Sequence, residues 1–129
     1  MFRRSEEKRA EKRAREAAIQ AEVDRLQALS PEALAVEVLP ILAAEAGKKS
    51  RVGHLYVSDI CRELVGTVSG RVNLALKQPV REALQRLEHA NLVLQMTSAE
   101  MGSSWRITAE GEQAVGAGNI ADKLDPSTS

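Results

Sequence analysis

The stretch from Pro79 to Thr108 constrains the fold most, because its hydrophobic period changes from helical to extended within thirty residues. The apolar residues of its first part recur at i, i+3, i+4 and i+7, the spacing of one buried helical face. They are Val80, Ala83, Leu84 and Leu87. Proline is favoured at the first position of a helix, so Pro79 marks the predicted helix start. Residues 92–97 then predict a strand, residues 105–107 a returning strand after a polar turn, and Thr108 the cap of another short helix.

This succession resembles the second half of a winged helix-turn-helix domain of the kind found in MarR- and PadR-type bacterial regulators. It is also similar to the winged-helix modules attached to some restriction endonucleases. The matching motifs are Val80-x-x-Ala83-Leu84-x-x-Leu87-Glu88, Asn91-Leu92-Val93 and Trp105-x-Ile107-Thr108-x-x-Gly111. The resemblance covers Leu55 to Val115, and it implies DNA binding, although a few partner-binding modules share the architecture. Asn91 stands where these families usually have glycine, and asparagine tolerates the left-handed conformation that ends a helix.

We therefore predict an α+β fold, mainly α, namely a winged helix-turn-helix with an additional long N-terminal helix. The predicted parts are a charged helix over residues 1–29, the winged domain over residues 30–116 and a flexible tail over residues 117–129. Ser30-Pro31 predicts the start of the first helix of the domain, and Gly47 its end. Pro40 lies within this helix and is expected to kink or split it after Leu39.

The segment between this helix and Pro79 is less regular. Lys48-Lys49-Ser50-Arg51 predicts a basic loop, and Leu55-Tyr56-Val57 a short strand. Ser58 is then expected to cap a second helix that ends at Gly66. The connection from Thr67 to Gln78 is longer than the turn of a simple helix-turn-helix, and the sequence leaves open whether it is helical or extended.

The N-terminal segment is built from strong helix formers, since residues 5–29 contain neither Gly nor Pro and are rich in Ala, Glu, Arg and Lys. Its apolar stripe is thin until Ile19, Val23 and Leu26. Three interpretations remain open: a solvated helix packed only at its end, a dimer seam through these three residues, or a basic arm on DNA.

Charge is segregated along the chain although the formal net charge is zero. Residues 48–86 contain eight Lys and Arg against three Asp and Glu, and a local basic patch is what contact with phosphates requires. On the helix after Pro79, the outward residues suited to base edges are Gln78, Arg81, Glu82 and Gln85. The candidates for phosphate contacts are Lys48, Lys49, Arg51, Arg71 and Lys77.

The predicted wing tip, residues 98–104, contains Glu100 and neither Lys nor Arg. A wing that enters the minor groove normally uses basic side chains. Ser103 and Arg106 are therefore the candidates for backbone contacts there, unless the wing binds a protein. We expect double-stranded DNA as the partner and a homodimer as the assembly. The function would be transcriptional regulation or a plasmid or phage accessory role, and the alternative is a protein-interaction adaptor that binds no DNA.

Enzymatic function is not indicated. Cys61 sits on an apolar helical face and is expected in the core, and His54 and His89 lack the partner spacing of a zinc site. No phosphate-binding glycine loop is present, and we expect neither a metal nor another cofactor. No apolar run approaches the ~20 residues of a membrane helix. A single cysteine permits no intramolecular disulfide, and we expect a cytoplasmic, nucleoid-associated protein.

Overall fold

The computed structural model of the chain describes residues 2–48, 54–67, 70–98 and 102–124. Its elements are, in order, α1 (Phe2–Ala28), α2 (Pro31–Ala46), β1 (His54–Tyr56), α3 (Val57–Val65), α4 (Gly70–His89), β2 (Val93–Ser98), β3 (Gly102–Ile107), α5 (Ala109–Ala117) and α6 (Ile120–Leu124). The strands form one antiparallel sheet in the order β1-β3-β2. The predicted α+β class, in which helices predominate, is confirmed.

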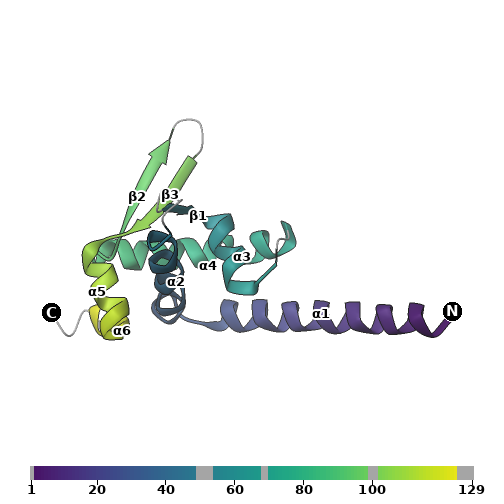
Figure 1. The fold of residues 1–129 in the computed structure, drawn as a ribbon. Helices are drawn as coiled ribbons and strands as arrows, with labels where there is room; N and C mark the ends of the chain where they lie inside the picture. The colour runs from purple at the N-terminus through teal and green to yellow at the C-terminus, as the bar shows by residue number, and fades with distance from the viewer. Residues whose placement is uncertain (1, 49–53, 68–69, 99–101, 125–129) are drawn as a thin grey trace.

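Helix α1 projects from the rest of the molecule as a straight rod (Figure 1). Residues 5–18 are all exposed, whereas Val23 and Leu26, both within the last two turns of the helix, are buried. The remaining helices surround α4 and one side of the sheet, and the hairpin of β2 and β3 extends away from them (Figure 1). The molecule thus has a body with two projections, the α1 rod and the β2–β3 hairpin.

Helix α4 forms the centre of the body. Its buried residues are Val72, Leu76, Val80, Ala83, Leu84 and Leu87, which confirms the predicted helical face and extends it by two turns. Leu34, Val38 and Leu42 of α2 are buried in the same core. Each large aliphatic side chain buried in this way contributes about 1.5–3 kcal/mol to folding.

Several local signals act as the sequence predicts. Ser30 Oγ accepts a hydrogen bond from the Ala33 N–H at 3.1 Å and caps α2. Thr108 Oγ1 accepts from the Gly111 N–H at 3.0 Å and caps α5, and it donates to the Asn91 carbonyl at 2.7 Å. Asn91 has a φ of 64°, the left-handed conformation expected at the end of α4.

The predicted helix start at Pro79 is wrong, because α4 begins at Gly70 and Pro79 lies inside it. A proline within a helix leaves the carbonyl four residues earlier without its backbone donor. That carbonyl belongs to Ala75, and the side-chain amide of Gln27 on α1 donates to it at 3.0 Å. The connection that the sequence left open is therefore helical from Gly70 onward.

Three further expectations need correction. Helix α2 continues through Pro40 to Ala46, so the split expected as one alternative after Leu39 does not occur, while the kink stays a prediction. Helix α3 begins at Val57, so Ser58 is not its cap; Asp59 Oδ2 accepts from the Tyr56 N–H at 3.1 Å instead. The tail from residue 117 contains α6, where Ile120 is buried, so it is not flexible throughout.

Candidate nucleic-acid interface

A groove of about 850 Å³ lies between α3, the outer side of α4 and the β2–β3 hairpin. Its lining residues are Val57, Ser58, Cys61, Gly70, Asn73, Leu74, Lys77, Arg81, Gln85, Gln95, Gly102, Ser103 and Trp105. Three elements that are separate in the sequence therefore contribute to one concave surface. The lining combines two cations with several hydrogen-bonding groups.

Helix α4 contributes one continuous side to this groove. Gly70, Leu74, Lys77, Arg81 and Gln85 follow each other at spacings of four and three residues, which places them in a row along the helix. The opposite side of α4 is buried in the core. Lys77 and Arg81 are exposed, and the ion pairs of the described residues do not involve either of them. Their charge is thus available to a ligand in the groove.

The hairpin forms the facing wall. Successive side chains of a strand point to opposite sides, so Ser103 and Trp105 of β3 face the groove together. Gln95 of β2, the register partner of Trp105, also lines it. The same alternation turns Arg106 away from the groove. The hairpin therefore offers a hydroxyl and an amide to the groove, and no cation among its described residues.

The structure brings together only part of the predicted DNA-binding set, namely Lys77, Arg81, Gln85 and Ser103. Arg71 lies on another side of α4, where it donates to Gln20 Oε1 of α1 at 3.1 Å. Gln78 and Glu82 lie outside the groove and are hydrogen-bonded to each other at 3.5 Å.

Of the predicted basic loop, the structure describes Lys48 alone. Lys48 forms an ion pair with the buried Glu45 at 3.2 Å and does not line the groove. Lys49 and Arg51 lie outside the described residues. Arg106 is exposed but faces away from the groove. Lys48 and Arg106 therefore add no charge to the groove lining.

Ser58, Asn73, Leu74 and Gln95 are among the groove residues that were not predicted as DNA contacts. Asn73 and Leu74 lie in the first turns of α4, and the side chain of Leu74 is 82% exposed. Leu74 could have been placed on the same helical side as Lys77 and Arg81, because the three residues have helical spacing. The interpretation of Pro79 as a helix start excluded residues 70–78 from that helix.

The proposed dimer seam is occupied within the chain. Val23 is 4% and Leu26 0% exposed, and both belong to the core formed with α2 and α4. Ile19 is partly buried against the same core. Val23 and Leu26 are therefore not free to pair with a second chain, whereas pairing through Ile19 stays a prediction.

Cys61 is buried at the base of the groove, and burial raises the pKa of its thiol to about 11 from an ordinary value of 9.0. Because the thiolate is the reactive form, the folded protein should hold roughly 100-fold less of it at pH 8 than the unfolded chain. We expect iodoacetamide to alkylate Cys61 at least that much more slowly in buffer than in denaturant. Equal rates in the two conditions would show that the thiol is accessible and unperturbed.

Other kinds of site find no support in the described part of the chain. No group of three His, Cys, Asp or Glu residues there could hold a metal ion. None of the described helices is both long and apolar enough to cross a membrane. No protein-family model, curated protein or solved structure matches the chain.

Proposed function

We propose that the chain is a winged helix-turn-helix protein that binds duplex DNA through the groove side of α4. The order α2, β1, α3, α4, β2, β3 agrees with that fold, with α3 and α4 as the helix pair and the hairpin as the wing. The observation that supports DNA most directly is that Lys77 and Arg81 form no ion pair with a described residue and lie in one groove with polar side chains.

In this proposal the N-terminal half of α4 enters the major groove, because the first residues of a recognition helix contact base edges. Asn73 would form paired hydrogen bonds to adenine, and Leu74 would contact a thymine methyl group. Lys77 would bind phosphate, and Arg81 would bind phosphate or guanine. The protein would act by occupying an operator, as a transcriptional regulator or a plasmid or phage accessory factor.

Replacing both groove cations, Lys77→Ala/Arg81→Ala, should weaken DNA binding by ~10-fold or more at low salt and lower the slope of log K against log salt by about 2. The measurement is fluorescence anisotropy of a labelled duplex at about 50 and 200 mM salt. The matched control is Arg86→Ala/Lys123→Ala, which removes the same charges outside the groove. Equal losses in the two double variants would contradict a role for the groove.

A protein-interaction adaptor is the second candidate, and the exposure of Leu74 favours it. A leucine that is 82% exposed beside the partly buried Val57 gives the groove an apolar part that a peptide side chain could cover. Binding of this kind depends on salt much less than phosphate contact does. Absence of duplex binding by the wild type at about 50 mM salt would favour the adaptor.

A further inference from the structure

The exposed part of α1 has a basic side that continues the side by which α1 packs on the body. Ile19, Val23 and Leu26 mark the packed side. Lys8, Lys12 and Arg15 precede Ile19 at successive spacings of four, three and four residues, so they lie along the same side of the helix. The row thus changes from apolar to basic where α1 leaves the body.

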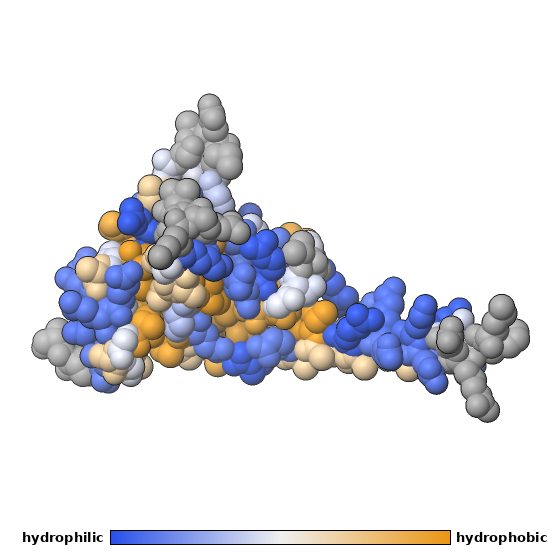
Figure 2. Space-filling view, viewed as in Figure 1, coloured by the Kyte–Doolittle hydropathy of each residue, from blue (hydrophilic) through white to orange (hydrophobic). Residues whose placement is uncertain are grey.

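The opposite side of this segment carries a row of alanines, which Glu6 and Arg13 border. Ala10, Ala14, Ala17 and Ala21 lie there, and all four are exposed. Figure 2 shows a weakly hydrophobic band along the lower edge of α1 near the body and hydrophilic residues above it. Glu11 and Glu16 border the basic row without forming an ion pair with it in the described chain. The three cations are therefore exposed and unpaired.

Contacts with α4 fix the direction in which α1, with its basic row, extends from the body. Gln20 of α1 contacts Arg71 in the first turn of α4, and Gln27 contacts Ala75 one turn further on, so the two helices run in the same direction. Followed toward its N-terminus, α1 consequently passes the N-terminal end of α4 and continues beyond it (Figure 1). Residues 5–18 span ~20 Å at 1.5 Å per residue.

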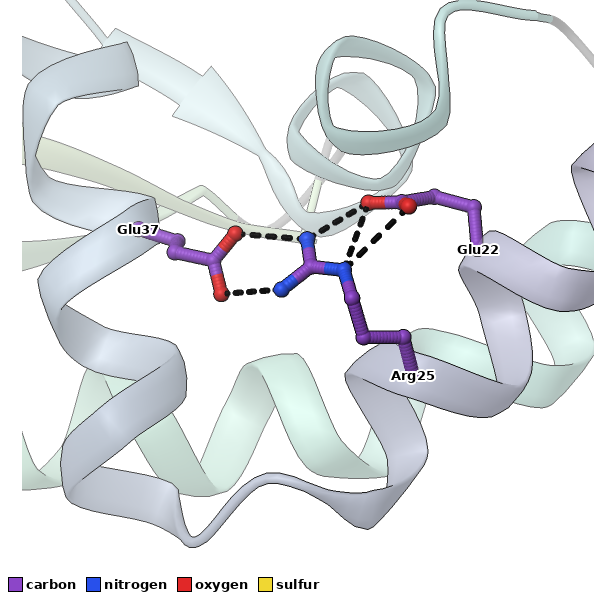
Figure 3. A network of polar contacts seen from close by, with 3 residues as sticks. All are labelled: Glu22, Arg25 and Glu37. Atoms are coloured by element: carbon purple, nitrogen blue, oxygen red, sulfur yellow. Dashed lines mark hydrogen bonds and ion pairs between the residues drawn. The ribbon is translucent and has the colours of Figure 1, made fainter.

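The direction of α1 is also fixed relative to α2. The guanidinium of Arg25 lies between Glu22 of α1 and Glu37 of α2, and it donates to the two Glu37 oxygens at 2.7 and 3.0 Å (Figure 3). This bidentate contact raises the pKa of Arg25, and the hydrogen bond from Arg25 lowers the pKa of Glu22. With Leu26 in the core, the helix is held as a rigid extension of the body.

We propose that Lys8, Lys12 and Arg15 bind the phosphate backbone of the same duplex that enters the groove. This inference rests on the proposed function, since it places DNA at the N-terminal end of α4. An exposed row of unpaired cations on a rigid rod suits a regular array of phosphates, which needs charge and no specific side-chain pocket. The α1 rod would then lengthen the DNA segment covered, with the wing on one side of α4 and the rod on another.

Arg15→Gln and Arg13→Gln provide a matched test. Both arginines are exposed on the same helix, and they lie about 160° apart around it, so only Arg15 belongs to the basic row. Glutamine removes the charge and is nearly as good a helix former as arginine. We expect Arg15→Gln to lower the salt slope by about 0.9 and Arg13→Gln to leave it nearly unchanged.

The triple variant Lys8→Gln/Lys12→Gln/Arg15→Gln should lower the slope by about 3, and it should weaken binding equally for every duplex sequence. Circular dichroism of each variant checks that α1 remains helical. Equal slopes for Arg15→Gln and Arg13→Gln, with wild-type binding that still requires Lys77 and Arg81, would overturn the role of α1 and leave the proposed function standing. Absence of wild-type binding would overturn both.

Discussion

Replacement of Gly111 by alanine is expected to destabilise the protein by about 3 kcal/mol, the upper end of the cost of overfilling a packed site. A Cβ atom at Gly111 would collide with the carbonyl oxygen of Leu92 and lie 2.6 Å from Cγ1 of Ile107. Neither neighbour can move easily. The Leu92 carbonyl accepts from the Thr108 N–H at 3.0 Å, and Ile107 is buried.

Gly116 in the same helix is the control. An added Cβ there meets no atom within 4 Å, so Gly116→Ala should be neutral or stabilise the protein by up to ~1 kcal/mol, since alanine is the better helix former. Urea unfolding followed by circular dichroism measures both variants. A Gly111→Ala protein as stable as the wild type would mean that α5 does not pack on the start of β2 as described.

Leu26→Ala is expected to lower the free energy of unfolding by about 2–5 kcal/mol, the range for removing a fully buried leucine side chain. Leu26 is 0% exposed, although it belongs to a helix that is mostly solvent-exposed. Its side chain lies in the core shared by α1, α2 and α4. The substitution therefore tests whether the end of α1 is part of the folded body.

Leu74→Ala is the matched control, because it removes the same atoms from a side chain that is 82% exposed. Its effect on stability should stay within about 0.5 kcal/mol, as for most surface substitutions. Should Leu26→Ala prove equally harmless, α1 would be a detached extension, and the inference about its basic row would lose its geometric basis.

The parts of the fold that could be predicted are those encoded by neighbouring residues. The spacing of Val80, Leu84 and Leu87 determines a buried helical face whatever surrounds it, and it was confirmed. The caps at Ser30 and Thr108 likewise depend on atoms within three residues. These features depend only on residues close together in the sequence, so they can be predicted from the sequence alone.

The start of α4 could not be predicted in this way. Proline favours the first position of a helix locally, but the turns of α4 before Pro79 bury Val72 and Leu76, and Gln27, distant in the sequence, donates to the Ala75 carbonyl that Pro79 leaves without a backbone donor. The wrong helix start also affected the predicted site, because it placed Asn73 and Leu74 outside the helix and so excluded them as contacts. Arg71 was assigned to DNA because nothing local shows that Gln20 lies beside it.

The apolar stripe at the end of α1 posed a different problem. Ile19, Val23 and Leu26 require an apolar partner, but their spacing is the same whether that partner is a second chain or the body of the same chain. Val23 and Leu26 are buried against α2 and α4, so for these two residues the partner is the body of the same chain. Sequence periodicity identifies which face is buried, whereas the partner depends on tertiary structure.

The hydrogen bond between Gln27 and the Ala75 carbonyl has a mechanical consequence. Pro79 leaves α4 with a gap in its backbone bonding, and α1 fills that gap from outside. A force that displaces α1 therefore also acts on the middle of α4, between the turn that contains Leu74 and the turn that contains Arg81. Pro79→Ala would supply a backbone donor to the Ala75 carbonyl from within α4, so amide exchange around Ala75 should then respond less to a change at Gln27.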